Sequence, residues 1–165
     1  MKLARVLRHL LSFPGAVKRA LPRAALARIE KAIKKAEAGH RGEIRFAVET
    51  ALESGALLSG QSSRSRALEV FSLLRVWDTE ENNGVLIYLL LADRAAEIVV
   101  DRGIHAKVQA AEWRQICSRM ESAFSKGEFE RGVVSGIEEV SRLLARHFPP
   151  RPGDRNELPD KPAVL

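Results

Sequence analysis

The chain contains little of what several common functions require. It has one cysteine, Cys117, so no intramolecular disulfide and no cysteine cluster for zinc can form. The longest uncharged apolar stretch, residues 84–92, is too short to cross a bilayer. Arg5, Arg8 and Lys18 interrupt the apolar run that a signal peptide needs. No Gly-x-Ser-x-Gly elbow and no dinucleotide-binding fingerprint occurs in the sequence. These absences predict a cytoplasmic protein and give no complete catalytic motif.

The length of 165 residues and a hydrophobic content of 45% suit one domain with a single core. Pro14-Gly15 and Leu21-Pro22 break the N-terminal helical pattern, and five prolines fall within residues 149–165. The sequence therefore predicts a basic amphipathic arm over 1–22, an α/β domain over 23–148 and a proline-rich flexible tail over 149–165.

Positive charge is concentrated at the N-terminus. Residues 1–41 hold eleven Lys or Arg and two Glu, a balance of +9, although the whole chain carries +6. The remaining residues, 42–165, are therefore slightly acidic, at −3. A concentrated basic segment attracts anionic partners such as lipid headgroups, nucleic acid or an acidic protein.

The first residues of the arm have the spacing of a short amphipathic helix, with apolar side chains on one side and Lys2, Arg5, Arg8 and His9 on the other. This helix could lie on a membrane surface or dock on the domain or on a protein partner. Only Phe13 is available in the arm to stack on bases, and no known motif is present, which argues against nucleic acid. The residues assigned to a membrane or partner contact are Leu3, Arg5, Leu7, Arg8, Leu10 and Leu11.

Three segments have the pattern of β-strands. Residues 43–50 alternate apolar and polar side chains, which predicts a strand with one buried face. Residues 85–91 are continuously apolar, as in a central strand covered on both faces. Residues 97–101 follow a short turn at 93–94 and are predicted to pair with the central strand as an antiparallel hairpin.

Apolar residues recur at helical spacing before, between and after these strands, and helices must cover both faces of the central strand. The predicted fold class is α/β, an α/β/α sandwich with a small mixed central sheet flanked by helices on both faces. Gly132 and Gly136, four residues apart on the last helix, predict a close approach to a neighbour. Cys117 falls on the apolar stripe of its helix and is predicted to be core.

The segment ENNGVLIYLLLADRAAEIVVDRGI at 81–104 resembles the core of the TPM domain family, a family of thylakoid-lumen and bacterial proteins. EIRFAVE at 43–49 matches the first strand of that family, and the similarity extends over residues 26–148. The tail PGDRNELPDKPAVL resembles a short bacterial, cytoplasmic subgroup. The resemblance implies an α/β/α sandwich, and in different members an acid phosphatase, a calcium binder or an accessory factor.

Two positions differ from the pattern of the family. Many members carry an acidic residue directly before the Asn-Gly, where this chain has Asn82. Many carry Gly-x-Gly after the hairpin, where this chain has Asp101-Arg102-Gly103 and keeps the second glycine alone. These differences favour a non-enzymatic accessory domain that acts through protein contacts at or near the inner membrane. The alternative is a cation-dependent acid phosphatase.

The best candidate for a site lies where the central strand begins and its hairpin partner ends. Antiparallel pairing brings these two ends together at one edge of the sheet. Oxygen ligands from such loops suit calcium or magnesium, and Arg102 could bind an anion such as phosphate. The alternative, which the absence of an EF-hand-like ligand register favours, is that these are solvated residues around a turn. The predicted metal ligands are Asp78, Glu80, Glu81, Asn82 and Asp101.

Overall fold

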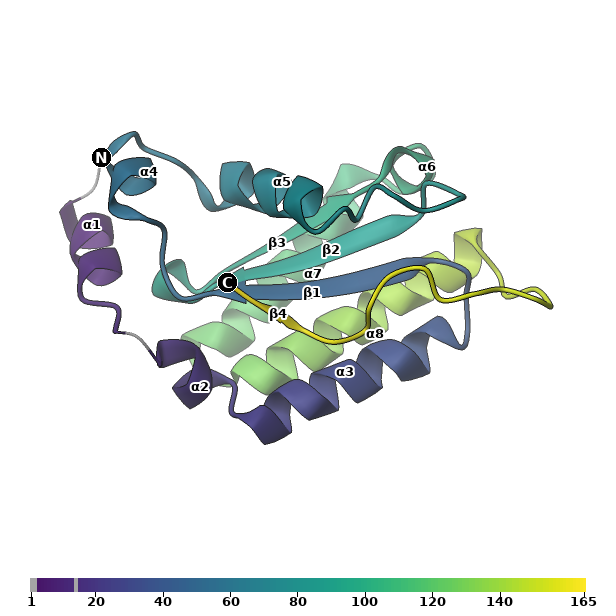
Figure 1. Cartoon of the computed structure of the whole chain (residues 1–165), viewed down its shortest axis with the longest axis horizontal. Helices are drawn as coiled ribbons and strands as arrows, with labels where there is room; N and C mark the ends of the chain where they lie inside the picture. Colours follow the sequence, from purple (N-terminus) through teal and green to yellow (C-terminus); the bar gives the residue numbers. More distant parts are fainter. Residues whose placement is uncertain (1–2, 14) are drawn as a thin grey trace.

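A computed structural model describes residues 3–13 and 15–165 of the chain (Figure 1). Met1, Lys2 and Pro14 of the predicted arm lie outside the described residues. The elements in chain order are α1 (Leu3–Leu10), α2 (Ala16–Ala20), α3 (Arg23–Glu37), β1 (Glu43–Glu49), α4 (Ser54–Leu58), α5 (Ser63–Leu73), β2 (Gly84–Leu90), the 3-10 turn η1 (Leu91–Asp93), β3 (Ala95–Val100), α6 (Arg102–His105), α7 (Ala110–Ser125), α8 (Phe129–His147) and β4 (Ala163–Val164).

The four strands form one mixed sheet in the order β3-β2-β1-β4. β1 runs parallel to both β2 and β4, and β2 is antiparallel to β3. Every residue of β2 is buried, which confirms the continuous apolar run as an interior strand. The hairpin pairs Val85 with Val100 and Leu90 with Ala95, so the predicted antiparallel pair is confirmed.

Helices cover both faces of the sheet, which confirms the α/β/α sandwich. α3, α7 and α8 pack on one face, and α5 lies on the opposite face, as Figure 1 shows. The first layer buries the larger apolar cluster, which includes Ile29, Phe46, Ile87, Phe124 and Ile137. The second layer buries a smaller cluster around Ala67, Val70, Leu86 and Tyr88.

The two predicted glycines of α8 allow a close helix contact. A Cβ atom at Gly132 would lie 2.6 Å from the Phe124 ring, and one at Gly136 would lie 2.5 Å from the Met120 sulfur. Both neighbours belong to α7. Larger residues would push these helices apart, so the low helix propensity of glycine is offset by packing.

β1 differs from its sequence-based prediction. The alternating pattern predicts that Arg45, Ala47 and Glu49 face solvent, yet all seven residues of β1 are buried. The reason is that α5 and the C-terminal segment cover this face and supply polar partners. Arg45 donates to the backbone carbonyls of Pro159 and Lys161, and Glu49 is bound by side chains of α5 and β2.

The C-terminal segment, predicted to be a flexible tail, crosses the domain in an extended conformation. Its β4 residues pair with Ala47 and Val48 of β1, and Leu158 is buried with the α5-side cluster. The backbone N–H of Leu158 donates to Glu43 Oε2 at 3.0 Å. The proline content of this segment indicates flexibility. Backbone pairing with β1 and the buried Leu158 side chain nevertheless hold it against the domain.

Candidate functional site

The structure brings together the two loops that the sequence assigns to one sheet edge. The N–H of Asp101 donates to the carbonyl of Gly84 at 2.9 Å, and the N–H of Gly103 donates to the carbonyl of Asn82 at 3.0 Å. Arg102 Nε also donates to the Asn82 side-chain oxygen at 2.8 Å. We call residues 78–83 and 101–103 the loop pair. The predicted juxtaposition of Asn82 with Asp101 and Arg102 is therefore present.

The local backbone explains why these residue types occur in the loop pair. Asn82 has a φ of 52°, in the left-handed region that asparagine tolerates better than most residues. Asp101 precedes α6, and its Oδ1 accepts the N–H of Arg102 at 2.7 Å. Asn82 and Asp101 thus each have a structural role at a turn or a helix start.

Arginine side chains bind two of the predicted acidic ligands. Glu81 is paired with both Arg41 and Arg151, which come from the segment before β1 and from the C-terminal segment. Asp78 is half-exposed and pairs with Arg75 at 2.7 Å. Each carboxylate therefore already has a cationic partner.

The other two predicted carboxylates differ in their surroundings. Glu80 is exposed, and its backbone N–H donates to Glu157 Oε2 at 2.9 Å. Asp101 is 9% exposed, and its Oδ2 atom has no hydrogen-bond partner among the described residues. In residues 3–13 and 15–165, no three His, Cys, Asp or Glu side chains are grouped to hold a metal ion. Of the carboxylates of the loop pair, Asp101 has an oxygen atom that is buried and has no hydrogen-bond partner among the described residues.

A second polar site lies at the carboxyl end of β1 and was missed by the sequence reasoning. Glu49 Oε2 accepts the Tyr88 hydroxyl at 2.6 Å, and Arg66 of α5 donates to both oxygens of Glu49 at 3.0 Å. Burial, together with the hydrogen bond to Glu49, raises the pKa of Tyr88. An open pocket of about 620 Å³ adjoins this network and is also lined by Gln61 and Glu69. The signal was the single tyrosine within an apolar strand, because a buried phenol needs a polar partner.

A third polar cluster lies under the C-terminal segment and was also missed. A pocket of about 340 Å³ is lined by Glu37, His40, Glu43 and Asp160, among others. Burial raises the pKa of Glu37 to about 9 and that of Glu43 to about 7, and it lowers the pKa of His40. The cluster forms because residues 154–160 fold back over the start of β1, a contact that no local pattern predicts.

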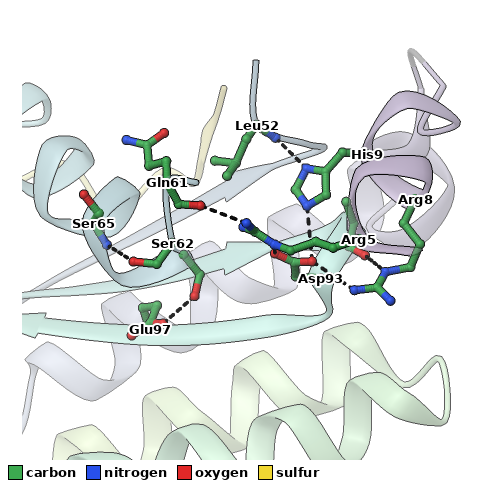
Figure 2. Close-up of polar contacts among 11 residues, drawn as sticks. Arg5, Arg8, His9, Leu52, Gln61, Ser62, Ser65, Asp93 and Glu97 are labelled. Atoms are coloured by element: carbon green, nitrogen blue, oxygen red, sulfur yellow. Dashed lines mark hydrogen bonds and ion pairs between the residues drawn. The ribbon is translucent and has the colours of Figure 1, made fainter. Parts of the chain in front are cut away.

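The N-terminal helix α1 binds the domain through its polar face. Arg5 Nε lies 2.9 Å from Asp93 Oδ2, and Arg8 Nη2 lies 3.2 Å from Asp93 Oδ1 (Figure 2). His9 is buried; its Nδ1 accepts the N–H of Leu52 at 3.0 Å, and its Nε2 lies 3.2 Å from Asp93. Arg5 and Arg8, assigned by sequence to a membrane or partner contact, are thus engaged with the domain.

Asp93 is the acceptor on which these contacts converge. Burial opposes its ionisation, but the contacts from Arg5, His9 and Arg8 outweigh that effect and lower its pKa. Arg5 also donates to the carbonyl of Gln61 at 2.9 Å, so α1 bridges η1 and the segment before α5. We call the contacts of Arg5, Arg8 and His9 with Asp93 the α1 clamp.

The prediction for Cys117 can be compared directly with the structure. Cys117 packs against the core, where burial raises the pKa of its thiol to about 12. Ser62 caps α5, with its side chain accepting the N–H of Ser65 at 3.0 Å. Within the described residues, no helix combines the length and apolarity needed to cross a membrane.

The family model of the TPM domain matches residues 18–143, and the chain belongs to this family. The NMR structure of the BA42 protein from the psychrophilic bacterium Bizionia argentinensis is similar at 32% identity and a TM-score of 0.75, over 86% of this chain and 93% of that chain. The N-terminal domain of a P. gingivalis protein shares the fold at 18% identity and a TM-score of 0.62, over 78% of this chain and 81% of that one. No protein with a curated function matches the chain.

Proposed function

We propose that this TPM-domain chain is a non-enzymatic accessory domain that acts through protein contacts, in the cytoplasm and peripheral to the inner membrane. The observation that carries the proposal is the position of Glu81 between Arg41 and Arg151. A carboxylate with two guanidinium partners gains little by exchanging them for a hydrated cation that carries its own desolvation cost. Asn82 and Asp101 have turn and helix-start roles, which supports a structural use of the loop pair.

A surface suited to protein contact lies directly before the loop pair. Trp77 is 48% exposed, and the guanidinium carbon of Arg75 lies 5.8 Å from the centre of its ring. Leu73, at the end of α5, is also exposed. Tryptophan and arginine are the residues that most often dominate protein interfaces. This surface supports the protein-contact part of the proposal.

Site-specific photocrosslinking tests the contact surface. A photoreactive amino acid in place of Trp77 is expected to give one discrete adduct in cells, and the same group in place of exposed Arg131 is expected to give none. Arg131 lies at the start of α8, outside the loop pair. Equal labelling at both positions, or no adduct at Trp77, would count against the proposed surface.

The alternative function, a cation-dependent acid phosphatase, is favoured by one observation. The Oδ2 atom of Asp101 is a buried carboxylate oxygen without a hydrogen-bond partner among the described residues, and exposed Arg102 is its neighbour. Most buried carboxylate oxygens are hydrogen-bonded, and a bound ion is one explanation for an oxygen that is not. Calcium or magnesium at Asp101 and a phosphate on Arg102 would be the corresponding ligands.

A hydrolysis assay separates the two functions. The accessory role predicts that turnover of a generic phosphomonoester with calcium or magnesium equals the buffer rate from acidic to neutral pH. Metal-stimulated turnover that is lost in Asp101→Asn and kept in Asp154→Asn would establish the phosphatase instead. Asp154 is an exposed aspartate of the C-terminal segment and serves as the matched control.

A further inference from the structure

The α1 clamp gives this amphipathic helix an unusual orientation. Amphipathic helices of soluble domains turn their apolar face to the core. In α1, His9 is the buried residue, Arg5 is half-buried, and Val6 is packed at the edge of the α5-side cluster. The leucines face away from the domain, with exposed fractions of 82% for Leu3, 55% for Leu7, 61% for Leu10 and 70% for Leu11.

The apolar face continues beyond the end of the helix. Phe13 is 49% exposed and lines a groove of about 470 Å³ with Leu11, Ala16 and Arg19. α2 lies at the same end of the molecule as α1, away from α6 and the loop pair (Figure 1). One end of the domain thus presents an exposed apolar face that nothing in the described chain covers.

Exposed positive charge flanks this face, and negative charge is absent from the same stretch of sequence. Residues 1–29 contain no Asp or Glu. Lys18 and Arg19 on α2 and Arg23 at the start of α3 are exposed, and the Arg8 side chain keeps 57% of its surface open although it contacts Asp93. A binding partner of this face must therefore contact exposed leucine side chains and carry negative charge.

We propose that the outward face of α1, formed by Leu3, Leu7, Leu10, Leu11 and Phe13, inserts into the surface of an anionic phospholipid bilayer while the α1 clamp holds the helix to the domain. This inference rests on the peripheral part of the proposed function and specifies its contact residues and orientation. Charge complementarity selects an anionic bilayer over a neutral one, because Arg19 lines the groove beside Leu11 and Phe13 and the Arg8 side chain of α1 is exposed.

Two weak contributions, apolar insertion and electrostatic attraction, together account for the proposed binding to the bilayer. Leucine side chains that enter the acyl boundary are removed from water, and nearby cations are attracted to anionic headgroups. The strength of binding of an amphipathic helix rises with the apolar area that it buries and with its attraction to anionic lipids, so the two contributions add. The α1 clamp adds preorganisation, since the helix is already folded and oriented before it meets the bilayer.

Vesicle co-sedimentation of the full chain tests the inference. The chain is expected to pellet with vesicles of phosphatidylglycerol and phosphatidylcholine and to remain in solution with phosphatidylcholine alone. The double variant Leu7→Glu/Leu10→Glu is expected to lower partitioning at least about tenfold, because two inserted side chains become charged. Leu68→Glu is the matched control, since Leu68 is a 48% exposed leucine on α5. Both variants change exposed residues, and unchanged thermal midpoints would show that they fold.

Three outcomes would overturn the inference. The first is the absence of pelleting with anionic vesicles, and the second is equal pelleting of the wild type and the Leu7→Glu/Leu10→Glu variant. The third is a concentration-dependent dimer without lipid that the same double variant abolishes, because the leucines would then cover a second copy of the chain. None of these results changes the outcome of the photocrosslinking at Trp77 or of the hydrolysis assay. Those two experiments therefore test the accessory role independently of the membrane contact.

Discussion

The backbone N–H of Gly103 donates to the carbonyl oxygen of Asn82 at 3.0 Å, and a Cβ atom at position 103 would lie 2.6 Å from that same oxygen. Glu81 contributes a second carbonyl oxygen at 2.7 Å from the same point. The two halves of the loop pair thus meet backbone to backbone, with no room for a side chain between them. This is the physical reason that the second glycine of the family pattern is kept here.

Gly103→Ala is expected to destabilise the fold by about 1–3 kcal/mol, because two backbone carbonyls must move to admit the methyl group. Urea unfolding followed by circular dichroism measures the change. Gly55→Ala is the control, since a Cβ atom at Gly55 of α4 meets nothing within 4 Å. That variant is expected to be neutral or slightly stabilising. Equal stability of the two variants would show that the loops are not in close contact.

Tyr88→Phe is expected to cost about 1.5–3 kcal/mol of unfolding free energy, since it removes a hydrogen bond to the buried carboxylate of Glu49. Tyr88 is the one tyrosine of the chain, and its pKa is raised by burial and by Glu49. The tyrosinate absorbance of the wild type should therefore appear at high pH only together with unfolding. Ionisation at the pH of free tyrosine in folded protein would contradict the Tyr88–Glu49 pair.

Glu37→Gln is expected to make the protein more stable at pH 8 and to leave it unchanged near pH 4. The pKa of Glu37 rises from 4.5 to about 9 on folding, because the carboxyl is buried. Between these values the unfolded chain has released a proton that the folded chain retains, so wild-type stability falls as pH rises through this window. Glutamine keeps the oxygen that accepts the N–H of Ile44 at 2.8 Å and does not ionise.

Thermal or urea unfolding across this pH window measures the effect of Glu37→Gln. The control is Glu30→Gln, a substitution on the exposed face of α3. Parallel stability-pH curves for the wild type and Glu37→Gln would mean that Glu37 ionises normally in the folded protein.

Asp93→Ala is expected to release α1 while the domain stays folded. The Leu52 N–H donates to His9 Nδ1, so its hydrogen exchange should accelerate when the α1 clamp is removed. Amides of β2 should exchange as in the wild type. Because the pKa of Asp93 is lowered in the folded state, the clamp should persist at neutral pH and weaken only as pH falls below the ordinary value of 3.8.

Hydrogen exchange followed by NMR gives the readout for Asp93→Ala. Asp78→Ala removes an exposed ion pair with Arg75 and is the matched control. Acceleration throughout the sheet would mean that Asp93 supports the whole domain, and unchanged exchange at Leu52 would contradict the α1 clamp.

The layers of the fold were predictable because apolar periodicity reports burial directly. The buried run of β2 requires helices on both faces of the sheet, and the apolar spacing of α5 on one face and of α7 and α8 on the other supplies them. The loop pair was also predictable, since hairpin geometry places the start of β2 beside the end of β3. Both inferences depend on local patterns.

The remaining features depend on polar partners that are distant in sequence. Glu49 and Arg45 resemble solvent-facing residues of a strand, but Arg66 and the C-terminal carbonyls satisfy them inside the fold. Glu81 likewise forms ion pairs with Arg41 and Arg151, which are both far from it in sequence. The orientation of α1 was not predictable, because Asp93, which contacts Arg5, Arg8 and His9, is far from these residues in sequence.

The packing of α3 against α8 has a consequence for how the chain folds. These helices are separated by more than half of the sequence, so their contact requires closure of a long loop and the loss of much chain entropy. β2, β3 and α7 are near neighbours along the chain and meet at a smaller entropic cost. We therefore expect the folding nucleus to contain the β2–β3 hairpin and α7, with α3 joining after the rate-limiting step. Substitutions in α3 should then accelerate unfolding far more than they slow refolding.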